Sequence, residues 1–87
     1  MTDNIEAILA ERQKTHGDYA THAQITQGLK MFMREYRSHI MLTSAQAEAL
    51  DMIAHKIGRI LAGNPDYKDH WVDIAGYAQL VVKELEK

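Results

Sequence analysis

The sequence contains no cysteine, so it can form neither a disulfide nor a thiolate metal site, and this fits a reducing compartment. Residues Met1–Glu6 lack the basic and apolar regions of a signal peptide. No apolar run approaches the roughly 20 residues that a membrane-spanning helix needs. The net charge of -2 argues against a generic nucleic-acid binder, which usually carries a basic patch. We therefore expect a cytoplasmic protein that binds neither membrane nor nucleic acid.

Large aromatic residues are also scarce, with one Phe and one Trp, although 46% of the residues are hydrophobic. With 87 residues the chain forms a single domain, residues 1–87. A domain of this size buries a modest fraction of its surface, so one copy alone would be only marginally stable. Oligomerisation is a common remedy. We therefore expect an all-α domain that assembles as a homo-oligomer.

Four helical segments and no strand are predicted. The first begins with Thr2 or Asp3 as its cap, runs to about Lys14, and turns its apolar residues inward. Those residues are Ile5, Ile8 and Leu9. Residues 15–18 form a break, because Gly17 can adopt a positive φ and Asp18 can cap the next helix.

The second predicted helix spans about residues 19–37, and its inward candidates recur at spacings of three and four. They are His22, Ile25, Leu29, Phe32, Met33, Tyr36 and Ile40. After a turn over residues 38–42, Thr43 and Gln46 form a capping box for a third helix over about residues 44–62. Residues 63–66 contain Gly and Pro and end this helix, and a fourth helix begins near residue 66 or 68.

Polar residues lie on one arc of the third helix and along one edge of the fourth. At about 100° per residue, one arc of the third helix is polar and the opposite arc is apolar. The polar arc carries Glu48, Asp51, His55 and Arg59, and the apolar arc carries Leu50, Ile53, Ile57, Ile60 and Leu61. In the fourth helix, His70, Asp73 and Tyr77 line the edge of an apolar arc that includes Trp71, Val82 and Leu85. The short connection makes the two helices antiparallel neighbours.

These residue types suit a magnesium-phosphate site. Glu48, Asp51 and Asp73 offer the oxygen ligands that Mg²⁺ prefers. Lys56 and Arg59 would grip phosphate oxygens and carry the catalytic role. The alternative is a solvated face on which the acidic and basic side chains pair with each other and contribute little.

The remaining candidates could contact a cofactor or substrate. His55 and His70 could be metal ligands, phosphate contacts or packed polar residues, and Tyr77 could stack on a base or pack in the core. Residues 15–19 form a polar turn that enters a helix N-terminus, a place suited to anions. For two further histidines, His22 and His39, we favour a packed polar role.

Two blocks resemble a group of small phage and prophage proteins of unknown function. They are the Glu-Arg-x-x-Thr-His-Gly-Asp-Tyr stretch at residues 11–19 and the segment from Leu42 to Val82. More remotely, the pattern is similar to the all-α MazG-like nucleotide pyrophosphohydrolases. That resemblance implies an acidic pair on each of two helices with Mg²⁺ between them.

On this resemblance Glu48-x-x-Asp51 would be the first acidic pair and His70-x-x-Asp73 the second. His70 replaces a Glu, and the loss of one carboxylate weakens a site for a hard cation, with Asp69 as a partial compensation. The resemblance implies Mg²⁺-dependent hydrolysis of a nucleoside triphosphate. The alternatives are a binder of a nucleotide or signalling nucleotide without turnover, and a purely structural helical oligomer.

Overall fold

The computed structural model describes residues 2–87, with side chains from residue 4 onward. Within this range the chain forms four helices and no strand, as predicted. The helices are α1 (Thr2–His16), α2 (Tyr19–Arg37), α3 (Ser44–Ala62) and α4 (Lys68–Leu85). The predicted cap of α1 at residue 2 or 3 lies outside the described side chains. No helix among the described residues is long and apolar enough to cross a membrane.

The predicted turn signals are confirmed at three helix boundaries. Asp18 caps α2, because its carboxylate accepts a hydrogen bond from the Thr21 backbone N–H. Thr43 and Gln46 form the reciprocal capping box of α3. Gly63 ends α3.

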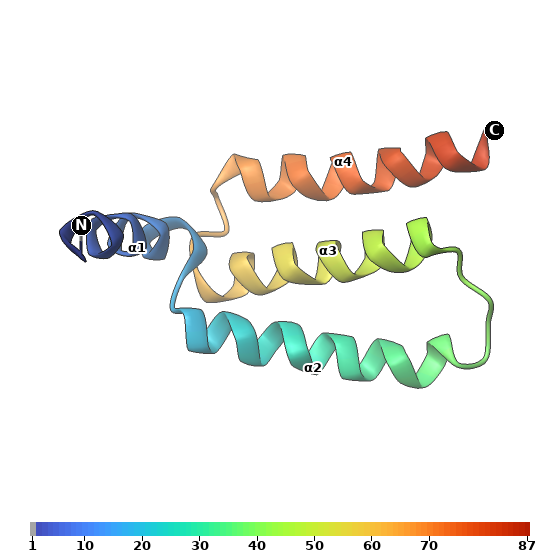
Figure 1. Cartoon of the computed structure of the whole chain (residues 1–87), viewed down its shortest axis with the longest axis horizontal. Coiled ribbons are helices and arrows are strands. Elements are labelled where there is room, and N and C mark those ends of the chain that lie inside the picture. The colour runs from blue at the N-terminus through green and yellow to red at the C-terminus, as the bar shows by residue number, and fades with distance from the viewer. Residues whose placement is uncertain (1) are drawn as a thin grey trace.

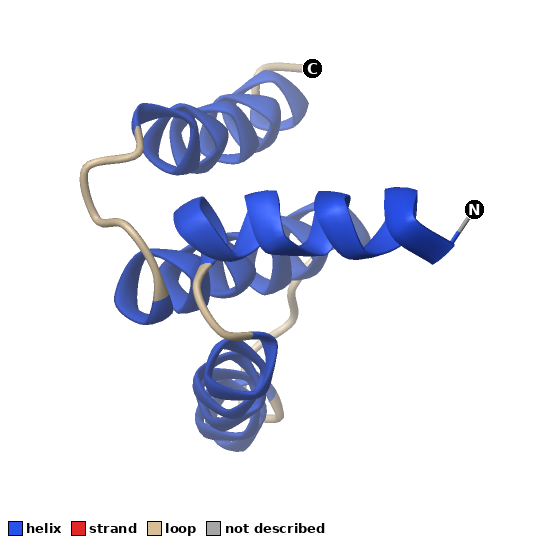
Figure 2. Cartoon of the chain, turned by 90° about the vertical axis from the view of Figure 1, so that its left-hand side faces the viewer, coloured by secondary structure: helices blue, strands red, loops and turns tan. Residues whose placement is uncertain are grey.

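Three of the helices form a single layer. Helices α2, α3 and α4 run antiparallel and side by side, with α3 in the middle (Figure 1). Within the described residues α3 packs against both neighbours, whereas α2 and α4 do not touch each other. Helix α1 crosses one end of this layer and contacts α2 and α3 (Figure 2). The layer therefore has two broad faces, and α1 covers only one end of it.

Backbone contacts between two turns hold α1 in this crossing position. The carbonyl of Thr15 accepts a hydrogen bond from the Asn64 backbone N–H at 3.1 Å and another from His70 Nε2 at 2.9 Å. Gly17 has φ 79°, and a Cβ there would overlap the carbonyl of Ala62. A Cβ on Gly63 would lie 2.5 Å from the Gly17 nitrogen. The α1–α2 turn and the α3–α4 turn therefore touch through their backbones.

The layer buries few apolar side chains. The hydrophobic residues that are buried within the described range are Ala49 and Ala54. The inward prediction is wrong for Phe32, Tyr36 and Ile40, whose side chains are 61%, 61% and 60% exposed. It is also wrong for α1, whose three predicted inward residues are exposed. An outer helix of a single layer has one neighbour, so only a narrow strip of its apolar arc is covered.

Helices α2 and α3 approach each other closely at Gly58. A Cβ at this position would overlap the hydroxyl of Thr26 and lie 2.7 Å from His22 Cδ2. Both of these side chains are buried, so neither can move into open space.

We therefore expect Gly58→Ala to lower the free energy of unfolding by about 1–3 kcal/mol, because overpacking forces a backbone shift. Urea denaturation followed by circular dichroism measures the change. The matched control is Gly76→Ala in α4, where a Cβ meets nothing within 4 Å, and which should raise stability by up to about 1 kcal/mol. Equal stabilities of the two variants would contradict the close approach.

Candidate functional site

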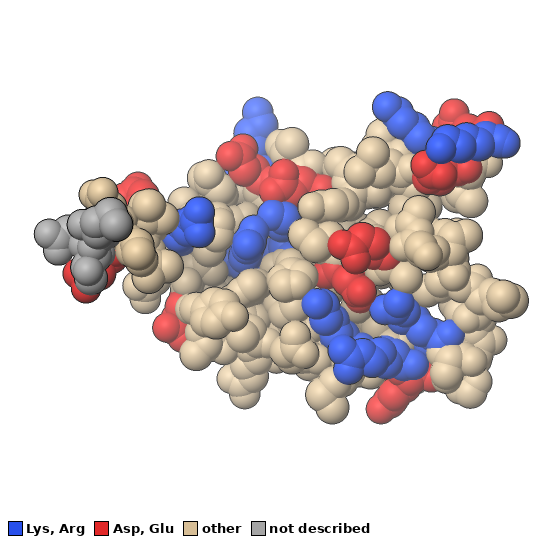
Figure 3. Space-filling view, in the orientation of Figure 1, with Lys and Arg blue, Asp and Glu red and all other residues tan. Residues whose placement is uncertain are grey.

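The polar arc of α3 lies open on one broad face of the layer, between α2 and α4. We call this surface the charged face; its members are Glu48, Asp51, His55, Lys56 and Arg59 of α3, Lys30 and Arg37 of α2, and Asp73 of α4. Figure 3 shows acidic and basic side chains gathered over the middle of this face. The antiparallel α3–α4 hairpin brings Asp73 of α4 to the same surface as the polar arc of α3.

The predicted metal ligands do not converge within one chain. Asp51 forms an ion pair with Arg37 of α2 at 3.0 Å, whereas Asp73 pairs with Lys56 at 2.9 Å. Glu48 is exposed. Asp51 faces α2 and Asp73 comes from the opposite side, so α3 stands between them. Among the described residues, no three His, Asp or Glu side chains are grouped so that they could hold a metal ion.

Lys56 lies buried between α3 and α4, with its side chain 9% exposed. The hydrogen bond that its ammonium donates to Asp73 is the main reason that the pKa of Asp73 lies below its ordinary value. A buried ammonium is costly without a counter-charge, so this pair holds α4 in register with α3. Lys56 therefore contacts a carboxylate where a phosphate contact was predicted.

His55 connects the charged face to α2. Its Nε2 accepts a hydrogen bond from the Lys30 ammonium at 3.2 Å, so the ring is neutral in this arrangement. Its backbone carbonyl accepts a hydrogen bond from His22 Nε2 at 3.2 Å. Burial, and then the charge of Lys30, lower the pKa of His55. His55 thus occupies the open face, where a ligand can reach it.

The other two predicted contact residues lie on α4. His70 is 1% exposed, and its ring is engaged with the Thr15 carbonyl as described above. Its place is that of a tether between α4 and the end of α1. Tyr77 is half-buried one turn beyond Asp73. The nearby Trp71 is exposed, and its indole N–H donates to the Pro65 carbonyl at 2.8 Å.

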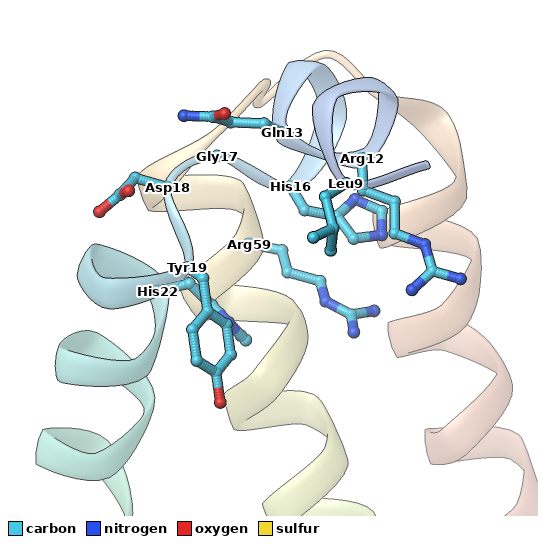
Figure 4. A pocket seen from close by; sticks show the side chains of 9 residues that line it. All are labelled: Leu9, Arg12, Gln13, His16, Gly17, Asp18, Tyr19, His22 and Arg59. Carbon is cyan, nitrogen blue, oxygen red and sulfur yellow. The ribbon is translucent and has the colours of Figure 1, made fainter. Parts of the chain in front are cut away.

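A hollow lies beneath α1, at the end of the charged face. It is a cavity of about 680 Å³, bounded by the end of α1, the first turn of α2 and the end of α3 (Figure 4). Its lining residues are Leu9, Arg12, Gln13, His16, Gly17, Asp18, Tyr19, His22 and Arg59. Arg59 is the one predicted site residue among them.

The cavity gathers positive charge. Arg12 and Arg59 supply two guanidinium groups, and no acidic side chain among the described residues forms an ion pair with either. The carboxylate in the lining belongs to Asp18 and is already engaged, accepting hydrogen bonds at 3.1 Å from both the backbone and the hydroxyl of Thr21. This arrangement favours an anionic ligand.

Two imidazoles complete the lining. Burial, and then the charge of Arg59, lower the pKa of His16. Burial also lowers the pKa of His22, opposed by the hydrogen bond that its ring donates to the His55 carbonyl. Both rings are therefore neutral at pH 7, and each can take up a proton when an anion enters. In Figure 4 the Tyr19 ring and the Arg59 side chain border the same hollow.

Sequence reasoning identified this region only in part. The turn over residues 15–19 was predicted to suit anions, and the motif at residues 11–19 contains Arg12, His16 and Tyr19. The cavity role of these side chains depends on α1 crossing α3, which periodicity within one helix does not reveal. The packed polar role favoured for His22 is confirmed by its burial, and the same residue also lines the cavity. The same prediction is wrong for His39, which is exposed.

A family model for a domain of unknown function, DUF6378, matches residues 1–85. The match includes all four helices and every residue of the cavity. No curated protein and no solved structure matches the chain. The comparisons therefore give a family and leave its activity open.

The lowered pKa values predict that acid weakens the fold. The pKa of His16, His22 and His55 lies below the ordinary value of 6.5, so the unfolded chain takes up protons first as the pH falls through 6.5. Stability is thus fully present above pH 6.5 and decreases toward the folded pKa values. We expect a lower melting temperature at pH 5.5 than at pH 7.5. In the double variant His16→Gln/His55→Gln the melting temperature should change less between these two pH values. A melting temperature that rises on acidification would contradict these shifts.

Proposed function

We propose that this chain, which belongs to the DUF6378 family of domains of unknown function, binds a nucleotide through its phosphates in the cavity beneath α1. One observation carries the proposal: two guanidinium groups and two imidazoles from three helices line a single cavity whose carboxylate is engaged elsewhere. The planar guanidinium fork matches phosphate oxygens.

The remaining geometry supports a small organic phosphate. The cavity volume of about 680 Å³ falls within the usual range for small-molecule sites, roughly 300–1,000 Å³. The exposed ring of Tyr19 offers a stacking surface for a base. Phage origin, a cytoplasmic location and self-association are expectations from the sequence that this proposal retains.

A Mg²⁺-dependent pyrophosphohydrolase of the MazG-like kind is the second candidate. In its favour, Arg59 belongs both to the cavity and to the face that carries the predicted acids. The donors within one chain do not fit Mg²⁺, however, since Asp51 and Asp73 are each paired with a base and no third ligand joins them. Binding without turnover is therefore the function that the geometry supports best.

The binding proposal predicts that two arginines dominate affinity. We expect ATP and inorganic triphosphate, each in the presence of EDTA, to bind the wild-type protein, and Arg12→Gln or Arg59→Gln to weaken binding about 10-fold or more. Calorimetric titration measures this. Arg34→Gln is the matched control, because that exposed residue of α2 does not line the cavity.

Affinity should also rise as the pH falls from 8 to 6, since a bound anion favours protonation of His16 and His22. Isotherms that are the same for wild type and both cavity variants would overturn the site. If inorganic triphosphate bound as tightly as ATP, the cavity would be a site for the phosphates alone and would not recognise the nucleoside.

Asp73 separates the two candidate functions. Asp73→Asn leaves the buried Lys56 ammonium without its counter-charge, so we expect a lower free energy of unfolding even in EDTA. Adding Lys56→Met should restore stability, because the charge that needs a partner is gone. Urea denaturation with and without Mg²⁺ distinguishes the roles. A wild-type protein that Mg²⁺ stabilises, with that gain lost in both variants, would favour the hydrolase.

A further inference from the structure

The broad face opposite the charged face is apolar. On α3 the arc with Leu50 and Leu61 lies opposite the polar arc, at about 100° per residue. Lys30 and Arg37 turn toward the charged face from one side of α2, and Phe32 and Tyr36 project from its other side. On α4, Asp73 turns toward the charged face, and Trp71 and Val82 lie on the opposite side of the helix. We call Phe32, Tyr36, Leu50, Leu61, Trp71 and Val82 the apolar face; all six are exposed.

The exposed area is too large for a lone compact chain. A monomeric protein of 9.9 kDa exposes about 5,200 Å² by the usual size scaling, whereas this chain exposes 6571 Å². The excess is about 1,400 Å², which is more than the roughly 800 Å² per partner of a standard interface. The radius of gyration agrees, at 15.0 Å against about 12 Å expected for 87 residues.

Because the core is small, the fold requires a partner surface that buries the apolar face. Two alanines are the only buried hydrophobic residues in the described chain, so most of the apolar burial that folding needs has to come from another surface. A partner surface that folding requires must be present wherever the chain itself is present. A second copy of the same chain meets this condition.

We propose that the apolar face is a homodimer interface, in which two layers pack face to face. The six residues that define the face are uncharged, so apposing two copies brings no like charges together at its centre. A second hollow of about 330 Å³ can receive side chains of the partner; its lining is apolar except for Arg37, whose guanidinium is paired with Asp51. Both charged faces and both cavities then point outward. This arrangement does not depend on nucleotide binding.

Neighbouring residues of α2 provide a matched test. Phe32 and Met31 are 61% and 63% exposed, but Phe32 lies on the apolar face and Met31 points away from α3 at the outer edge of the layer. Light scattering should give twice the chain mass for wild type and for Met31→Lys. Phe32→Lys should give the mass of one chain or an unfolded protein. A folded wild-type protein with a mass of 9.9 kDa at micromolar concentration would overturn the proposal. This holds even if that monomer binds a lipid vesicle or another protein.

Two further measurements cover the case in which Phe32→Lys does not fold. The melting temperature of the wild type should rise with protein concentration, as it does when folding and association are coupled. Because the chain has no cysteine, Leu61→Cys and Met31→Cys each carry one thiol. Maleimide should label Leu61→Cys at least about tenfold more slowly, although both positions are similarly exposed in one chain. Equal labelling rates, or a melting temperature independent of concentration, would overturn the interface.

Discussion

The contact between the two turns at one end of the layer determines where the cavity beneath α1 lies. One backbone carbonyl, that of Thr15, accepts hydrogen bonds from the Asn64 N–H and from the His70 ring. The two glycines at the contact leave no room for a side chain. These two hydrogen bonds fix both the end of α1 and the start of α4 against the α3–α4 turn. Without them α1 would not roof the cavity, and Arg12 and His16 would not face Arg59.

The charged face obeys a second constraint, the need to neutralise charge close to the helix contacts. Lys56 is buried and takes Asp73 as its partner, and Asp51 takes Arg37. These pairs lie on opposite sides of α3, so they hold α4 and α2 in register with the central helix. Arg59, one turn further along α3, has no such partner in the described chain and borders the cavity. The same helix face is thus structural in its middle and available to a ligand at its end.

The sequence was sufficient for the local structure and insufficient for the site. Helix boundaries followed from caps and breakers, as Asp18, Thr43 and Gly63 illustrate, because these residues act on their own neighbours. The face of α3 that carries Asp51, His55 and Arg59 also followed from periodicity alone. The partners of these side chains did not follow from the sequence. An acidic residue on a polar arc has the same spacing whether it binds a metal ion or pairs with a basic side chain. The exposure of Phe32 and Tyr36 was missed because an apolar stripe predicts that a surface is covered without saying that the cover belongs to the same chain.

The roof of the cavity, α1, is less firmly held than the three helices of the layer. The floor residues His22 and Arg59 belong to helices that pack extensively against each other, whereas α1 makes few contacts with the layer, and its Ile5, Ile8 and Leu9 are exposed. Elements with few buried contacts open locally at a lower free energy than the global unfolding free energy. We therefore expect α1 to open locally at a lower free energy than the layer. The cavity then exists only in the fraction of molecules in which α1 is docked on the layer. An anion held between Arg12 and Arg59 would increase that fraction, and would therefore slow amide exchange in α1 more than in the other helices.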